Sequence, residues 1–573
     1  MVILRPVIHN YPPGNPECDL TVLNSGVFVA IIHTINSRSQ PHTRDMCPYD
    51  THTFTAAPKP MTARRTRKKG QLSARQAMHA KRSVAPEINP CPPGVTGGQY
   101  QPLTETDIKN IYASALKILS ELGMGESPEA LTTQALSKGA ELNDKGRLCF
   151  PAAMVEDIIA GACRGFTLYG RDPAHNIEIG GDKVYYGTGG AAVQTLDLDT
   201  GSYRAATLKD LYDFTRLADT LTNVSWFTRC CVATDVADIT ELDINTAYAL
   251  LKGTTKPVGT SFTVAATVDP IIDMFDTALG GNDKFRSKPF CKAHISPVIS
   301  PLRYGDDAFE VALACMNRGV PLNNIIAAQS GATSPATLAG MLACTLAETL
   351  AALVMVNIFK PGYPMIFSNW PFVIDLRTGS FCGSGGEITL LNAASAQLSN
   401  WLGLPSGAAS SMSDSKAVDA QMGLEKAMSS LGVGLAGCNM VYESSGMMAS
   451  LLGASFEAML IDDEMLSQVY RTLRGIEVNE ETLGFDAIKD AIYGEGHFLG
   501  AQHTMDAMQR DYFWPGTLTD RQQPSAWEED GSRDMWQRAN SRVREILSSH
   551  HPVYLESSID KSIRDHYPIL LPA

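Results

Sequence analysis

Short apolar runs alternate with longer helical stretches after residue 224, and this alternation constrains the fold more than any other feature. The runs begin at seven positions, Val224, Val258, Phe290, Asn324, Met365, Leu404 and Cys438. Successive starts lie roughly 33 to 40 residues apart, the length of one β-strand plus one helix. Strands that alternate with helices form a parallel sheet with right-handed crossovers. Seven or eight such units in about 250 residues predict an α/β fold of the (β/α)8 TIM-barrel type.

An open, doubly wound α/β sheet is the alternative arrangement. Such a sheet usually carries a glycine-rich phosphate-binding turn directly after its first strand. No glycine-rich turn follows the run at Val224, where the next glycine is Gly253, and the sequence GxxxxGK[ST] is absent. The barrel is therefore the better prediction.

The rest of the chain divides into a tail and a set of additions. Residues 1–98 are rich in Pro, Ser, Thr, Arg and His, and are expected to be a disordered tail. Alternatively, translation starts at Met61 and the first sixty residues are an upstream extension. The first sixty residues differ in character from the stretch that follows Met61, and this difference favours the start at Met61. Residues 99–220 are expected to form helices and a β-hairpin that pack on the barrel. Residues 221–573 should hold the barrel and a C-terminal helical segment.

Charge and cysteine usage exclude several classes of protein. The chain has 47 Lys and Arg against 61 Asp and Glu, a net charge of −14, which argues against binding nucleic acid by phosphate neutralisation. The twelve cysteines contain no CxxC pair, which is typical of reduced thiols in a cytoplasmic protein. No uninterrupted apolar run reaches the ~18 residues that span a bilayer. We therefore expect no membrane partner, whereas a homo-oligomer is compatible with the sequence.

The loops that follow the predicted strands carry the candidate site residues, because chemistry in such barrels lies at the carboxyl ends of the strands. These loops combine aromatic side chains, carboxylates and small residues, a composition typical of a pocket for a polar or cationic molecule. The candidates are Trp226, Phe227, His294, Trp370, Phe372, Arg377, Glu387, Asp414, Tyr442 and Glu443.

Several short motifs, in a specific order between about Pro102 and Pro568, resemble the trimethylamine:corrinoid methyltransferase family. They include Leu168-Tyr169-Gly170-Arg171-Asp172-Pro173, Asp199-Thr200-Gly201 with Arg204, Leu217-Ala218-Asp219, Asp375-Leu376-Arg377-Thr378-Gly379, Leu404-Pro405, Ser413-Asp414-Ser415-Lys416 with Asp419-Ala420-Gln421, Gly496-His497-Phe498-Leu499, Trp514-Pro515 and Asp520-Arg521. The resemblance implies the same barrel with helical additions. It also implies methyl transfer from a methylated amine to the cobalt of a corrinoid protein.

Some members of this family carry a pyrrolysine near the barrel centre. That position aligns within the loop Ser410 to Lys416, at about Met412, and an ordinary residue stands there. The chain therefore resembles the pyrrolysine-free branch, which includes glycine betaine methyltransferases. A quaternary amine of the betaine type is the better substrate prediction, and trimethylamine is an alternative. The cob(I)alamin or other corrinoid would be carried by the partner protein, and no tightly bound cofactor or metal is expected in this chain.

A quaternary ammonium is recognised by aromatic faces and nearby carboxylates. Trp370, Phe372, Tyr442 and Trp226 are the expected substrate-binding aromatics, and Asp414, Glu387 and Glu443 are the expected catalytic carboxylates. Arg377 or His294 would bind a substrate carboxylate. For each residue a structural role remains the alternative, such as packing in the core for Trp226 or capping the helix after Glu387.

Three other hypotheses stay open. The first is a zinc site, with ligands from Cys230, Cys231, Cys291 and His294. Adjacent cysteines on a strand point to opposite faces, which argues against it. Lys416 or Lys292 would serve as a Schiff-base nucleophile. The third hypothesis is that the chain is a non-catalytic module that binds methylated amines or a corrinoid protein.

Overall fold

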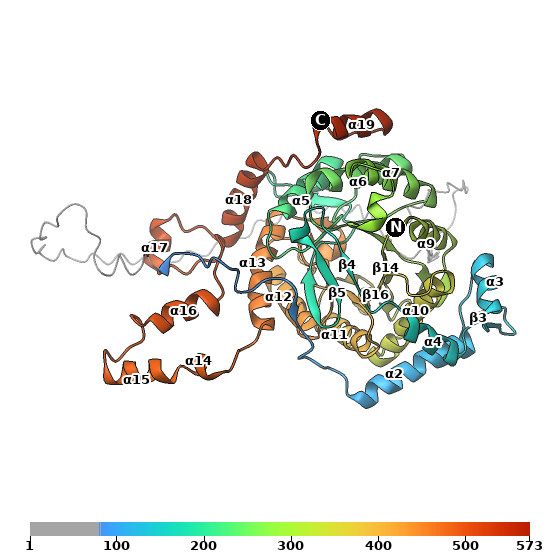
Figure 1. Ribbon diagram of the computed structural model, residues 1–573, viewed down its shortest axis with the longest axis horizontal. Helices are drawn as coiled ribbons and strands as arrows, with labels where there is room; N and C mark the ends of the chain where they lie inside the picture. The colour runs from blue at the N-terminus through green and yellow to red at the C-terminus, as the bar shows by residue number, and fades with distance from the viewer. Residues whose placement is uncertain (1–79, 81, 573) are drawn as a thin grey trace, which may run out of the picture.

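Eight parallel strands form a closed barrel at the centre of the computed structural model, which describes residues 80 and 82–572 (Figure 1). In spatial order they are β6 (Lys183–Tyr186), β20 (Met440–Tyr442), β19 (Ser406–Ala409), β16 (Met365–Asn369), β14 (Leu322–Ile326), β11 (Cys291–Ile295), β10 (Val258–Thr260) and β9 (Phe227–Thr228). Backbone hydrogen bonds join the two ends of this sheet. The Ser225 amide donates to the Tyr186 carbonyl at 2.8 Å and the Thr188 amide to the Trp226 carbonyl at 3.4 Å.

Each strand is followed by one helix, as the alternation in the sequence predicts. The helices, in the order of the strands along the chain, are α5 (Leu208–Asp219), α6 (Ile239–Gly253), α7 (Val268–Ala278), α9 (Asp306–Arg318), α10 (Leu338–Phe359), α11 (Gly386–Trp401), α12 (Ala420–Leu435) and α13 (Phe456–Leu473). All seven predicted runs contain or closely precede a barrel strand, so the (β/α)8 prediction is confirmed. The chain has one GxGxxG sequence, Gly432 to Gly437, which lies at the end of α12 rather than after a strand.

The predicted boundary at residue 221 is wrong by one strand. Lys183 to Tyr186, assigned from the sequence to the N-terminal additions, is β6, and it pairs in parallel with β20. The first β/α unit, β6 with α5, therefore precedes residue 221. A short strand, β1 (Val95–Thr96), adds to β6 in the antiparallel direction.

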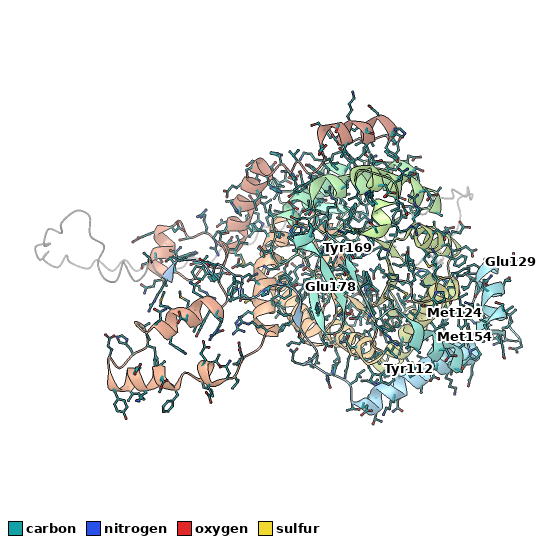
Figure 2. The ribbon with its side chains drawn as sticks, in the orientation of Figure 1. Tyr112, Met124, Glu129, Met154, Tyr169 and Glu178 are labelled. Carbon is teal, nitrogen blue, oxygen red and sulfur yellow. The ribbon has the colours of Figure 1, made fainter. Side chains whose placement is uncertain are left out.

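The N-terminal additions cover one side of the barrel. Helix α2 (Glu105–Lys117) begins at a capping box formed by Thr104 and Asp107. Helices α3 (Glu129–Ser137) and α4 (Ala152–Gly161) follow, and all three contact α10. Figure 2 shows Tyr112 of α2 and Met154 of α4 at this edge, where both pack against the core. The predicted hairpin is β7 (Gln194–Leu196) with β8 (Tyr203–Ala205).

Helix α10 is long and apolar enough to cross a membrane by length and composition alone. It belongs instead to the barrel layer, because 94% of its most apolar window is buried inside the protein. Its burial on all sides comes from β14 and β16 beneath it and from α2, α3 and α4 above it.

A C-terminal arm, residues 480–510, projects away from the barrel after α13 (Figure 1). It consists of α14 (Glu480–Leu483), α15 (Phe485–Tyr493) and α16 (Gln502–Arg510). The described start of the chain lies beside it, since the Gln509 side chain donates to the Val84 carbonyl at 2.9 Å. The predictions for residues 1–79, including a start at Met61, lie outside the described residues.

After the arm the chain returns to the barrel. Helix α18 (Met535–Ser549) packs on α13 and α5, and α19 (Ser557–His566) packs on α7.

Candidate active site in the barrel interior

Strand β11 points Lys292 and His294 into the barrel and its other three residues toward the helices. Side chains alternate along a strand, and the contacts of β11 follow that rule. The Lys292 ammonium donates to Thr228 Oγ1 of β9 at 2.8 Å, and the His294 ring lies 5.1 Å from the Tyr442 ring of β20. Both partners lie on other strands of the barrel, so Lys292 and His294 are at its centre.

Four rings gather around this point and form what we call the aromatic cluster: Trp226, His294, Trp370 and Tyr442. The Tyr442 ring centroid lies 5.2 Å from that of Trp226 and 5.2 Å from that of Trp370. The His294 and Trp370 centroids are 6.3 Å apart. All four residues are buried. The structure thus brings together four residues that the sequence predicts for substrate binding.

A small residue makes room for one of these rings. A Cβ atom on Gly187, just after β6, would lie 2.2 Å from the Trp226 ring. The Trp226 side chain therefore fills the space that a side chain at position 187 would otherwise occupy.

A chain of hydrogen bonds links neighbouring strands inside the barrel and includes the His294 ring. Ser368 of β16 donates to Asn323 of β14, and the Asn323 amide faces His294 Nε2 at 3.3 Å. The Lys292 Nζ lies 3.1 Å from the same Nε2. Burial is the main cause of the low pKa of both groups: that of Lys292 falls to about 7 and that of His294 lies well below its usual range.

Glu443 follows β20 directly and is held in an unusual backbone conformation, with φ of +65°. It is fully buried, and burial raises the pKa of its carboxyl to about 8, partly offset by Lys426. Its Oε2 atom has no hydrogen-bond partner among the described residues, and neither has the buried Nε1 of Trp370. Buried polar atoms without partners are uncommon and often mark a place that a ligand completes.

The other predicted site residues lie elsewhere. Arg377 is exposed and pairs with Asp375 two residues away, and Glu387 is exposed in the first turn of α11. Asp414 accepts hydrogen bonds from the Gly383 amide and from Ser450, so it links three loops. Phe372 is buried against Phe381, 5.1 Å between centroids. These contacts describe structural positions outside the aromatic cluster.

The structure shows where the residues of the zinc and Schiff-base hypotheses lie. Cys291 lies on the helix-facing side of β11 and His294 on the inner side, so the two do not converge, and no group of three His, Cys, Asp or Glu in the described part of the chain is placed to hold a metal. Lys416 is exposed and donates to the Asp414 carbonyl. Lys292, in contrast, is buried within the aromatic cluster.

Sequence reasoning missed the polar residues that support the cluster. Thr228, Asn323 and Ser368 lie in runs that are buried on both faces, where alternation of polar and apolar residues is not visible. The signal that finds them is their position, because each faces the barrel interior in register with an inward neighbour: Thr228 with Gly259, Asn323 with His294 and Ser368 with Ile325.

Comparison with known proteins decides the family. The sequence profile of the family described as trimethylamine methyltransferase matches residues 64–567. The chain belongs to the trimethylamine methyltransferase family. It is 29% identical over 467 residues to the glycine betaine methyltransferase of Desulfitobacterium hafniense, covering 81% of this chain and 96% of that protein. It is also 29% identical over 475 residues to a trimethylamine methyltransferase of Methanosarcina barkeri, covering 82% and 95%.

Among solved structures, the monomethylamine methyltransferase of Methanosarcina barkeri aligns over 80% of this chain and 96% of that chain, with 12% identity and a TM-score of 0.41. As a member of the trimethylamine methyltransferase family, the protein is a methyltransferase that acts between a methylated amine and a corrinoid protein. Relatives with two different amines in their names match at equal identity, so identity does not select between them.

Proposed function

We propose that the protein transfers a methyl group from a quaternary amine of the betaine type to the cobalt of a corrinoid protein. The observation that carries the proposal is the aromatic cluster, four buried rings around one point, which come from β11, from β20, from the residue before β9 and from the residue after β16. Aromatic faces attract a quaternary ammonium, most strongly when water is excluded. Glu443, whose Oε2 is unpartnered, adds negative potential when ionised.

The chemistry of the leaving group supports a quaternary substrate. When the N–CH3 bond of a quaternary ammonium breaks, the electron pair stays on nitrogen and a neutral tertiary amine leaves. The methyl group passes to the reduced cobalt, which supplies the electron pair of the new bond. This chain then has to orient the N–CH3 bond and exclude water, and no covalent adduct with the protein is required. Met412, which is buried next to Gly383, fits that requirement because its thioether offers no electrophile to which an amine could add.

The test mixes the purified protein with cob(I)alamin and separate candidate amines, and follows the cobalt absorption spectrum. We expect methylcobalamin with glycine betaine or another quaternary amine. Formation of methylcobalamin with trimethylamine alone would support the second candidate, a trimethylamine enzyme. Measurable amine binding without methylation of cobalt would favour a non-catalytic binding module.

We also propose a cytoplasmic location. The ten cysteines of the described residues are all free thiols, which suits a reducing compartment. Fractionation of cells with an antibody against the protein tests this location.

A further inference from the structure

The aromatic cluster, which is proposed to receive a cation, already contains one. The Lys292 ammonium lies 4.7 Å from the centroid of the Tyr442 ring and 5.7 Å from that of the Trp226 ring. Lys292 is fully buried, and no described carboxylate forms an ion pair with it. Two cations in one buried cluster repel each other strongly unless an anion lies between them.

The surroundings of Lys292 hold its nitrogen in place without neutralising its charge. Its two hydrogen-bond partners are the neutral Thr228 hydroxyl and His294 Nε2. Because Nε2 faces two donors, from Lys292 and Asn323, the arrangement assigns the His294 proton to Nδ1, which makes Nδ1 a donor. A Cβ on Gly259 would lie 2.6 Å from Lys292 Nζ, so only glycine on β10 leaves room for the ammonium.

We infer that Lys292, positioned by Thr228 and His294, is the anchor for a carboxylate carried by the substrate. The inference rests on the proposed function and narrows its substrate to a zwitterion, with a quaternary ammonium at one end and a carboxylate at the other. The carboxylate neutralises Lys292, and the ammonium turns away from it toward the remaining aromatic faces. Lys292 takes the role that the sequence suggested for Arg377, which is exposed and paired with Asp375.

Proton linkage gives this anchor a signature. A carboxylate binds the charged lysine, and because the pKa of free Lys292 is about 7, binding above that pH takes up a proton. Affinity for a carboxylated amine should therefore fall as pH rises above about 7, by up to tenfold per unit. Of the titratable groups around Lys292, His294, Tyr442 and Cys291 stay neutral in this range because burial moves each pKa away from it.

Two further charged groups act on neighbours of Lys292, Arg229 on His294 and Glu443 on Tyr442. Arg229 contributes to the low pKa of His294, and burial lowers the pKa of Arg229 itself, partly offset by Asp243. Glu443 does titrate here, since burial raises its pKa to about 8. The pH series is therefore measured in a Glu443→Gln background, which removes that carboxyl.

The experiment compares wild type with Lys292→Met, a side chain of similar length without charge. The two probes are glycine betaine and tetramethylammonium, which share the methylated nitrogen but differ in the carboxylate. Binding is measured by calorimetry. Methyl transfer is measured separately, with cob(I)alamin as the acceptor. We expect Lys292→Met to weaken glycine betaine binding about 100-fold and to leave tetramethylammonium binding unchanged or tighter.

Equal weakening for both probes would overturn the anchor, and so would no weakening for either. Because calorimetry does not depend on turnover, failure of the proposed methyl transfer is distinguishable from failure of the anchor. If Lys292→Met does not fold, the pH series in the folded Glu443→Gln protein decides: a Kd for glycine betaine that does not change between pH 6.5 and 8.5 contradicts the inference.

Discussion

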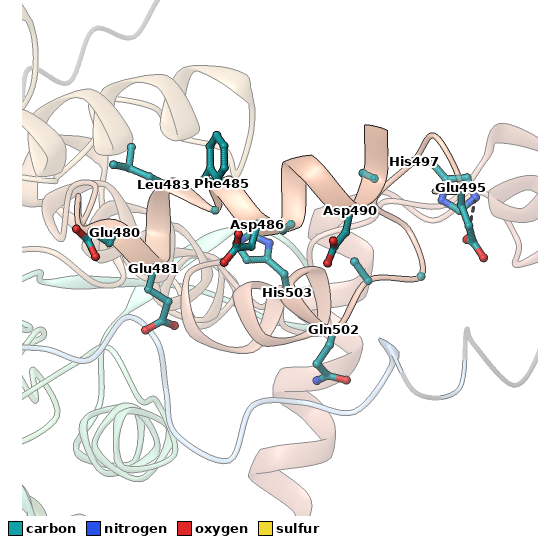
Figure 3. Close-up of a pocket in the computed structure, with 15 residues that line it drawn as sticks. Glu480, Glu481, Leu483, Phe485, Asp486, Asp490, Glu495, His497, Gln502 and His503 are labelled. Atoms are coloured by element: carbon teal, nitrogen blue, oxygen red, sulfur yellow. Dashed lines mark ion pairs between the residues drawn. The ribbon is translucent and has the colours of Figure 1, made fainter. Parts of the chain in front are cut away.

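The barrel interior and the C-terminal arm both gather titratable side chains, but in opposite ways. The interior cluster collects its residues from strands far apart in the chain and buries them. The arm collects a hollow of about 1130 Å³ from residues 480–503 alone. Figure 3 shows its carboxylates Glu481 and Asp486 pointing away from Leu483 and Phe485, and these side chains are exposed.

The difference shows where the fold moves the pKa of a side chain away from its usual value. Burial lowers the pKa of Lys292 to about 7 and raises the pKa of Glu443 to about 8. The arm carboxylates are solvated on a local helical hairpin, where water and salt screen charges. The candidate binding and catalytic residues therefore lie in the barrel interior, and substitutions in the arm serve as controls for substitutions there.

The largest expected effect comes from Gly187→Ala, which tests whether the cluster depends on tight packing. The new methyl group would lie 2.2 Å from the Trp226 ring, so that ring has to move. We expect methyl transfer to fall by more than about 100-fold, because small displacements of a positioned substrate have large effects on rate. The matched control is Gly161→Ala, where nothing lies within 4 Å of the new atom. Equal activity in both variants would contradict the packing argument.

Trp370→Ala tests the aromatic cluster as a cation site. A desolvated cation–π contact contributes about 2 kcal/mol, so kcat/KM should fall roughly 30-fold. Trp401→Ala is the control, since Trp401 lies on α11 beside Tyr112 and is 41% exposed. Steady-state kinetics with the active amine give the comparison, and unchanged kinetics in Trp370→Ala would remove this residue from the site.

Glu443→Gln tests the buried carboxyl through stability. The pKa of Glu443 rises from 4.5 to about 8 on folding, so its contribution is fully present below pH 4.5 and is lost as pH rises to about 8. We expect the wild type to lose on the order of 1 kcal/mol of unfolding free energy per pH unit in this window relative to the variant. Urea unfolding of both proteins at pH 5, 6.5 and 8 measures it. A pH-independent difference would show that Glu443 is ionised in the folded protein.

The smallest effect is expected in the arm. The double variant Asp486→Asn with Glu495→Gln removes two of the carboxylates that line the hollow. Methyl transfer should stay within twofold of wild type, and the free energy of unfolding within about 0.5 kcal/mol, as for most exposed substitutions. A tenfold loss of activity would mean that the arm takes part in the reaction.

The strength of sequence reasoning differs between the barrel and its interior. The spacing of apolar runs predicts seven strands, because burial on both faces makes each strand a continuous apolar run. Strand β6 escapes this reasoning, because it follows the N-terminal additions and lies outside the regular series. Trp226, Trp370 and Tyr442 are identifiable from the sequence as aromatic residues near the predicted strands. Arg377 and Glu387 are candidates because they follow a predicted strand, and both lie on the surface.

Lys292 is the instructive failure of that reasoning. In Cys-Lys-Ala-His-Ile the alternation places Lys292 and His294 on one face of the strand, but it does not show that this polar face is buried inside the barrel, as all five residues are. A lysine is usually exposed, and only the closed barrel, with glycine opposite, explains its position.

The pairing of large inner side chains with glycines on adjacent strands has a consequence for changing the substrate range. Trp226 occupies the space over Gly187, and Lys292 the space over Gly259. The two side chains of each pair share one space inside the barrel. A smaller residue at 226 would therefore be compatible with a larger one at 187, and the effects of the two substitutions on activity would not add. Variation of specificity should therefore proceed by exchanging partners across strands, in paired libraries, rather than by single substitutions at the rings.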